Sequence, residues 1–188
     1  MDLPDKAVSV GADGQADGFR PTPGWLPEVI PGSHTRLVVS LPGDKLEAVH
    51  RALVATLNPP LRVMVVQLVD RAAGRQLDPP LRFVALDVPP ADLDQALAAS
   101  RVFIYHDGRH QLWVQGSGQD RIVLEETGVV YVYPDDPLFR DTLVAAEVPE
   151  HETETMATRD YVRVSFTAAA DAEEVAFKNA VGLVPYGS

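Results

Sequence analysis

The sequence contains no cysteine and no long apolar run. Without cysteine, structural disulfides, thiolate nucleophiles, iron–sulfur clusters and thiolate zinc sites are excluded. Apolar runs such as Val63–Val66 and Val129–Tyr133 stop at four or five residues, whereas a membrane-spanning helix needs about 20. The first thirty residues also lack a basic start followed by an apolar stretch. We therefore expect no membrane partner and no secretory signal, and by default a cytoplasmic location.

Lysine is scarce, with 3 residues against 13 arginines, and the 188-residue chain carries a formal net charge of −11. Such a chain lacks the basic surface that releases counterions from a phosphate backbone, so nucleic-acid binding is disfavoured. The 46% of hydrophobic and 23% of charged residues are typical of a globular protein that buries a core.

Most of the excess negative charge lies in residues 135–160, where eight acidic residues face two basic ones and leave −6. One interpretation is a solvated helix and loop. The other is an acidic face that steers a basic partner protein toward this surface. The acidic residues are Asp135, Asp136, Asp141, Glu147, Glu150, Glu152, Glu154 and Asp160.

Glycine and proline are concentrated in residues 1–33, which predicts a partly disordered N-terminal arm. Trp25 and Ile30 are among its few large apolar residues, and they allow the later part of the arm to dock on the body. Residues 34–188 are expected to form a single α+β domain with a largely antiparallel sheet, packed by helices on one face.

Hydrophobic periodicity across residues 35–106 predicts the element order β-α-β-β-α-β. This is the order of a split β-α-β, ferredoxin-like unit. The alternative is that a strand–proline–helix junction, at Pro42 and again at Pro89, recurs by chance. The predicted strands are 35–41, 61–70, 81–88 and 102–105, the helices begin near 44 and 91, and 72–80 is a polar connection.

Short strands separated by turns follow, which predicts a β-meander over 102–133. A third helix is expected to begin at Asp135 or Asp136 with Pro137 in its first turn. A strand near 161–166 and a last helix near 171–180 complete the chain.

Two registers are open for the first hairpin of the meander. A two-residue turn at Asp107-Gly108 would pair His106 with Arg109, whereas a bulge at Gly108 would pair Tyr105 with Arg109. The aliphatic pattern favours the second register, because it gathers the aliphatic residues of both strands on one face.

In that register Phe103, Tyr105, Arg109 and Trp113 share the other face. Aromatic residues around an arginine are common at protein interfaces and in small-ligand pockets. The face is therefore a candidate binding site for a ligand or partner. The alternative is that a helix or the N-terminal arm covers it.

No complete catalytic or metal-binding motif is present. His106 and His110 supply two nitrogens at most, and residues 151–155 begin like a zincin helix but lack the second histidine. Gly116–Gly118 bridges two expected strands and is not a nucleophile elbow. We expect no metal and no cofactor.

Arginines also gather around the second strand pair, where an anion site is conceivable. The neighbouring aspartates can pair with them, which favours a solvated, self-paired hairpin. The arginines are Arg62, Arg71, Arg75 and Arg82, and the aspartates are Asp70, Asp78 and Asp87.

These observations favour a non-catalytic protein-interaction factor, such as an inhibitor, an immunity-type factor or an adaptor, whose partner is another protein. A small-molecule-binding or sensory module with its pocket on the aromatic face is the alternative. A second alternative is an enzyme assembled from dispersed residues, with His106, His110 and Glu125 as its first candidates. Exposed strand edges would also allow a homodimer.

Overall fold

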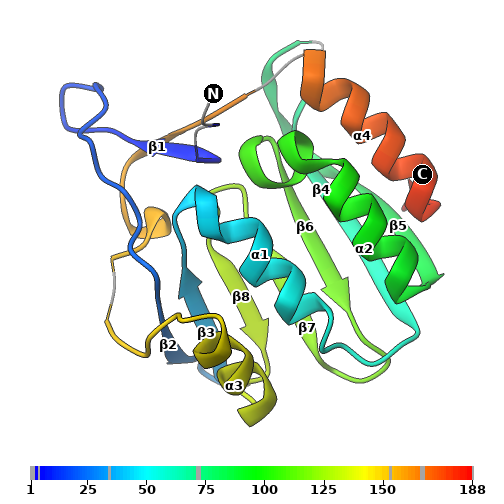
Figure 1. Cartoon of the computed structure of the whole chain (residues 1–188). Coiled ribbons are helices and arrows are strands. Elements are labelled where there is room, and N and C mark those ends of the chain that lie inside the picture. The colour runs from blue at the N-terminus through cyan, green and yellow to red at the C-terminus, as the bar shows by residue number, and fades with distance from the viewer. Residues whose placement is uncertain are drawn as a thin grey trace.

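An eight-stranded antiparallel sheet organises the chain (Figure 1). The computed structural model describes residues 3, 5–33, 35–70, 73–152, 154–165 and 168–187. Across the sheet the strands run in the order β10-β5-β4-β6-β7-β8-β3-β2. Their bounds are β2 Gly24–Val29, β3 Thr35–Ser40, β4 Leu61–Asp70, β5 Arg75–Val88, β6 His110–Gln115, β7 Arg121–Leu124, β8 Val130–Tyr133 and β10 Val184–Pro185.

The helices lie on one face of this sheet. Figure 1 shows α1 (Gly43–Val54), α2 (Pro90–Ala99) and α3 (Pro137–Ala145) over the same side. The last helix, α4 (Ala168–Val181), packs on α2 and on the same side of β5, where Lys178 lies 3.4 Å from the ring centroid of Phe83. The antiparallel sheet with helices on one face is confirmed, and none of the described helices covers the opposite face.

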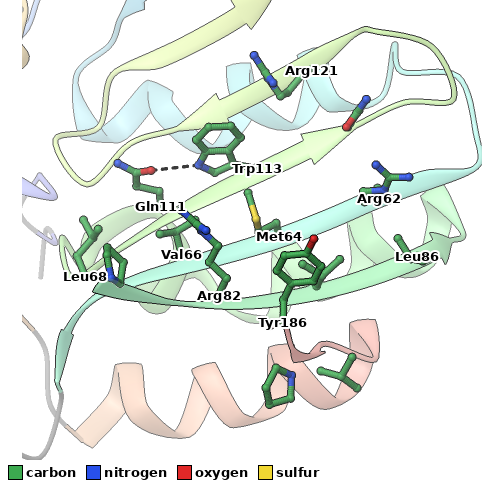
Figure 2. Close-up of a pocket in the computed structure, with 15 residues that line it drawn as sticks. Arg62, Met64, Val66, Leu68, Arg82, Leu86, Gln111, Trp113, Arg121 and Tyr186 are labelled. Carbon is green, nitrogen blue, oxygen red and sulfur yellow. Dashed lines mark hydrogen bonds between the residues drawn. The ribbon is translucent and has the colours of Figure 1, made fainter. Parts of the chain in front are cut away.

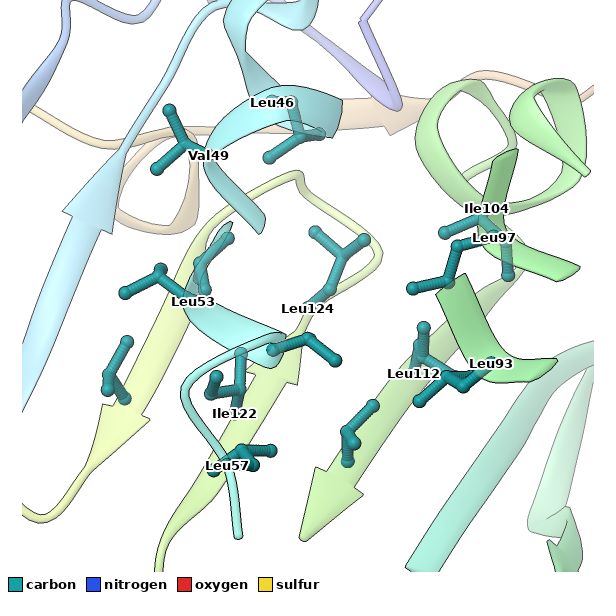
Figure 3. Close-up of a cluster of buried hydrophobic side chains, with 14 of the residues drawn as sticks. Leu46, Val49, Leu53, Leu57, Leu93, Leu97, Ile104, Leu112, Ile122 and Leu124 are labelled. Atoms are coloured by element: carbon teal, nitrogen blue, oxygen red, sulfur yellow. The ribbon is translucent and has the colours of Figure 1, made fainter. Parts of the chain in front are cut away.

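The core fills the space between the helices and the sheet (Figure 3). Side chains alternate along a strand, so Val63 and Val65 of β4 point into the core while Met64 points away. Leu46 and Leu53 lie on one face of α1, which packs over β7, and they are at most 2% exposed. The helix predicted to begin near residue 44 is therefore confirmed.

The expected strand at 102–105 is wrong. Residues Val102–His106 form a π-helical turn, η1, which follows α2 after a break at Ser100. The backbone N–H of Ile104 donates to the carbonyl of Ser100 at 2.9 Å, and that of Phe103 donates to the Glu173 carboxylate of α4 at 2.9 Å. Four consecutive buried residues, 103–106, give no alternation that would distinguish a buried strand from a buried helix.

Strand order also differs from that of a ferredoxin-like unit. In a split β-α-β unit one strand separates the two strands that flank the first helix, whereas three strands, β6, β7 and β8, separate β3 from β4. β5 begins at Arg75, inside the segment expected to be a polar connection, because its pairing with β4 continues to Asp70↔Arg75. The β6–β7–β8 meander is present as predicted.

The described part of residues 1–33 contains strands β1 and β2. β2 is an edge strand of the large sheet, and β1 (Ala7–Ser9) pairs with β9 (Tyr161–Arg163) in a small two-stranded sheet. Trp25, in β2, is 2% exposed and its indole N–H donates to the carbonyl of Val148. The N-terminal segment thus contributes both to the sheet and to the core.

Candidate binding groove on the open face of the sheet

A groove of about 960 Å³ lies on the sheet face that no described helix covers (Figure 2). It is formed by β4, β5, β6, the start of β7 and the C-terminal residues from β10 onward. Its lining residues are Arg62, Met64, Val66, Leu68, Pro80, Arg82, Val84, Leu86, Gln111, Trp113, Gln115, Arg121, Val184, Pro185 and Tyr186.

Strand pairing sets the apolar centre of the groove. Met64 of β4 lies opposite Val84 of β5 on one side and Trp113 of β6 on the other. We call Val84, Met64 and Trp113 the apolar row. Residues two apart on a strand point to the same face. The residues two positions before and after each member of the apolar row therefore also lie on the open face.

Polar rows flank the apolar row on both sides. On one side Arg62, Gln115 and Arg121 lie opposite one another across β4, β6 and β7. On the other side Arg82 of β5 lies opposite Val66, which lies opposite Gln111. An arginine therefore stands on each side of the apolar centre.

The groove carries positive charge in a chain whose net charge is −11. No carboxylate is among its lining residues. Within the described ranges, Arg62, Arg82 and Arg121 form no ion pair, whereas Arg75 lies 3.9 Å from Asp70. The expectation of a self-paired arginine cluster thus holds for Arg75 alone among the arginines that the structure describes.

Arg71 of the same sequence cluster lies outside the described residues.

Arg121 is distant from this cluster in the sequence, and it lines the groove because it begins β7. Its guanidinium carbon lies 5.2 Å from the Trp113 ring centroid and 4.4 Å from that of Tyr133. The buried Nε atom of Arg121 has no hydrogen-bond partner in the described chain. The cation–π contacts with these two rings hold the guanidinium at the end of the groove.

A chain of hydrogen bonds orients Trp113. The indole N–H donates to the side-chain oxygen of Gln111 at 3.1 Å. The amide nitrogen of Gln111 donates in turn to the Glu126 carboxylate at 2.7 Å. The half-buried ring therefore has a fixed orientation before anything binds, which reduces the entropy lost on binding.

Of the four residues expected on one aromatic face, the groove contains Trp113. Phe103 and Tyr105 belong to η1 and are at most 1% exposed beneath the helices, so the expectation that the four share a sheet face is wrong. The Tyr105 hydroxyl lies 3.2 Å from Nδ1 of His50, and burial raises the pKa of Tyr105. Arg109 is 4% exposed in the turn before β6. The expected alignment of these four residues needed a strand at 102–105, and η1 stands in its place.

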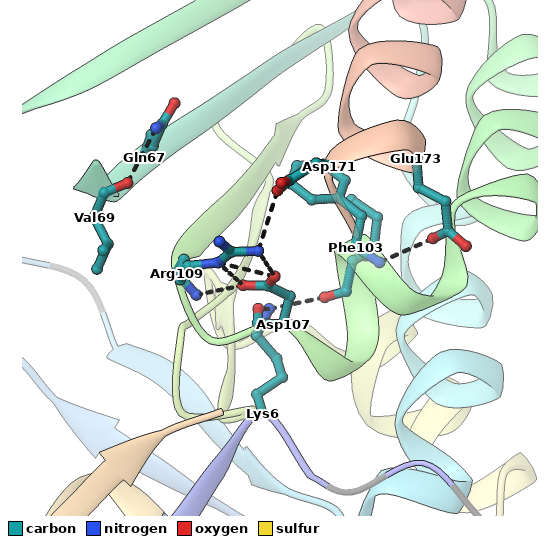
Figure 4. Close-up of polar contacts among 9 residues, drawn as sticks. Lys6, Gln67, Val69, Phe103, Asp107, Arg109, Asp171 and Glu173 are labelled. Carbon is teal, nitrogen blue, oxygen red and sulfur yellow. Dashed lines mark hydrogen bonds and ion pairs between the residues drawn. The ribbon is translucent and has the colours of Figure 1, made fainter. Parts of the chain in front are cut away.

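Arg109 belongs instead to a buried polar cluster at the end of η1 (Figure 4). Its guanidinium pairs with the fully buried carboxylate of Asp107, with contacts of 2.5 and 3.0 Å. The ammonium group of Lys6 donates to the carbonyls of Ile104 and Asp107, both at 2.8 Å. Burial lowers the pKa of Lys6 to about 7, while the Asp107 and Glu126 carboxylates oppose the shift. The cluster anchors the N-terminal segment to η1.

The candidates for an enzyme site lie outside the groove. His106 ends η1, and His110 begins β6 with its ring stacked on Phe103 at 4.1 Å between centroids. Glu125 is half-buried, and burial, with the neighbouring Glu126 carboxylate, raises its pKa to about 7. Because the side chains of His106 and His110 are buried, a substrate has little access to them.

Part of the acidic segment has intramolecular partners. The Asp135 carboxylate pairs with Arg140 at 2.6 Å, and the Asp136 carboxylate accepts a hydrogen bond from the backbone N–H of Leu138 at the start of α3. Glu154 pairs with Arg159. The exposed remainder consists of Asp141, Glu147, Glu150, Glu152 and Asp160.

In the part of the chain that the structure describes, no cluster of three or more histidine or acidic side chains could hold a metal ion. None of the helices in the same residues has the length and apolar character needed to cross a bilayer. Comparison with known proteins found no family, no curated protein and no solved structure that matches the chain.

Proposed function

We propose that the protein is a non-catalytic protein-interaction factor whose partner binds in the groove on the open sheet face. The observation that carries this proposal is the exposure of large apolar side chains along one wall of the groove. Leu86, Val184 and Tyr186 are 63%, 61% and 67% exposed and all three line it. Apolar surface gathered in this way is costly in water and marks docking sites for other proteins.

The composition of the groove supports the same proposal. Tryptophan, tyrosine, methionine and arginine are the residue types enriched at protein interfaces. Trp113, Tyr186, Met64 and three arginines provide them in one continuous surface. We also propose a cytoplasmic location.

A small-molecule-binding role is the second candidate, favoured by the size of the groove. Its volume of about 960 Å³ falls within the range of roughly 300–1,000 Å³ typical of ligand pockets. Native mass spectrometry of the gently purified chain distinguishes the two candidates. A retained mass of a few hundred daltons supports the small ligand.

The protein-interaction proposal is tested by site-specific photocrosslinking in the cells that produce the protein. A photoreactive amino acid at Leu86 should form a covalent adduct that is larger by the mass of a whole polypeptide. The same amino acid at Val175 serves as the control, because Val175 is 61% exposed on α4, outside the groove. Absence of a protein adduct at Leu86, or equal adducts at both positions, would count against the proposal. An adduct with a second copy of this chain identifies a homodimer.

A further inference from the structure

We infer that the groove binds an α-helix of the partner, with an apolar stripe flanked on both sides by aspartate or glutamate. This inference rests on the proposed function, because it specifies which partner segment the groove accepts. Three features of the open face carry it: the spacing of the arginine rows, the missing carboxylates and the prolines at the neighbouring sheet edge.

The spacing of the two polar rows matches the width of a helix. Arg62 and Val66 are four residues apart on β4, which places the two rows about 13 Å apart at about 3.3 Å per residue. An α-helix with its side chains is about 10–12 Å in diameter. A helix lying across the strands along the apolar row therefore has Arg82 on one flank and Arg62 on the other.

Arginines also recur along the direction in which such a helix would lie. Arg62 and Arg121 are two strands apart in the same polar row, which corresponds to about 10 Å at about 4.8 Å per strand. Carboxylates two turns apart on a helix are about 11 Å apart. One flank of the helix can therefore pair with both arginines.

Charge complementarity selects the sign of the partner. Three arginines line the groove without a carboxylate among the lining residues, and the described chain supplies none of them with an ion pair. An acidic helix would neutralise them without displacing an internal partner. A basic helix would place like charges together in a partly desolvated groove, which is unfavourable.

The alternative of adding an extended strand to the sheet edge is disfavoured by proline. Pro79 and Pro80 of β5 and Pro185 of β10 lie at that edge and have no N–H to donate. β10 and the Tyr186 N–H, which donates to the Arg82 carbonyl at 2.9 Å, already use part of the edge. The partner segment is therefore expected to lie on the face and not along the edge.

The inference is tested by fluorescence anisotropy with labelled synthetic peptides of about 15 residues. The first peptide carries leucine and phenylalanine at helical spacing i, i+3, i+4 and i+7, with glutamate on both flanks. The second replaces every flanking glutamate by glutamine, and the third carries one central proline. We expect saturable binding of the first peptide, at least tenfold weaker binding of the second and third, and weaker binding at higher salt.

The matched protein variants are Arg82→Glu in the groove and Arg20→Glu at an exposed position outside it. Arg82→Glu should weaken binding of the glutamate peptide at least tenfold, while Arg20→Glu should change it less than twofold. Circular dichroism melts of both variants verify that they fold. Because Arg82 is itself exposed, its replacement leaves the core intact.

Equal binding of the glutamate and glutamine peptides, equal binding to Arg82→Glu and the unmodified chain, or no binding at 1 mM peptide would overturn the inference. So would equal binding of the proline peptide, which would indicate an extended segment. If decanoate binds and none of the three peptides does, the groove is assigned to a small anionic ligand and the inference is overturned. If photocrosslinking at Leu86 captures a protein while these peptide results are negative, the proposed function stands and the helix inference fails.

Discussion

Replacing Lys6 by methionine should remove a pH dependence of the folding stability. The Lys6 side chain is 1% exposed, and burial lowers the pKa of its ammonium group from the ordinary value of 10.5 to about 7 in the folded chain. Between these two values the unfolded chain keeps the proton and the folded chain releases it. The free energy of unfolding of the unmodified chain should therefore rise with pH from about 7 to 10.5.

The magnitude follows from proton linkage. One proton bound in the unfolded state but not in the folded state changes the free energy of unfolding by about 1.4 kcal/mol per pH unit. From pH 7.5 to 9.5 the unmodified chain should gain about 2 to 3 kcal/mol relative to Lys6→Met. Taking the difference between the two proteins cancels the other groups that titrate in this range.

Urea unfolding at pH 7.5, 8.5 and 9.5, followed by circular dichroism, measures this difference. Lys45→Met is the matched control, because it removes one half-buried lysine of α1 outside the buried Lys6 cluster. A difference for Lys6→Met that does not change with pH, or that changes no more than the difference for Lys45→Met, would refute the reasoning. It would show that the two carbonyls and the Asp107 carboxylate keep Lys6 charged in the folded chain.

Three further outcomes are expected. Gly108→Ala should destabilise the chain by about 2 kcal/mol or more, measured by urea unfolding, because a Cβ there would stand 2.3 Å from the carbonyl oxygen of Lys6; a change below about 0.5 kcal/mol would contradict this contact. Asp136→Ala should cost about 1 kcal/mol of stability, because it removes the N-cap of α3, and an unchanged melting temperature would argue against the cap. Trp25→Phe should leave the emission of half-exposed Trp113, strongly quenched by acrylamide, while Trp113→Phe should leave the blue-shifted, poorly quenched emission of Trp25; equal quenching of the two would contradict their different burial.

Local patterns determined the elements that have a clear period or a clear terminus. The apolar stripe of α1 repeats at helical spacing, and the Asp136-Pro137 start of α3 combines an N-cap with a residue suited to the first turn. Short apolar segments separated by turns indicated the β6–β7–β8 meander. These elements are predictable because the interactions that define them join residues close in the sequence.

Residues 102–106 show where local patterns end. Four consecutive buried residues are compatible with a buried strand or a buried helix, and contacts with α4, 70 residues away, accompany the helical turn. The misplaced Phe103 and Tyr105 follow from that single error. The sequence around them holds no local signal for the position of α4.

The groove depended on tertiary structure for a similar reason. Arg62, Met64 and Val66 lie on one face of β4 because side chains alternate along a strand, but the sequence does not show which face the helices cover. Strand order decided that Arg121 and Tyr186, distant in the sequence, would join them. The elements with a clear local pattern, such as α1 and α3, follow from residues close together in the sequence. Only the packing of helices on one face decided which side chains remain open to a partner, because burial of apolar surface is a property of the whole assembly and not of any segment.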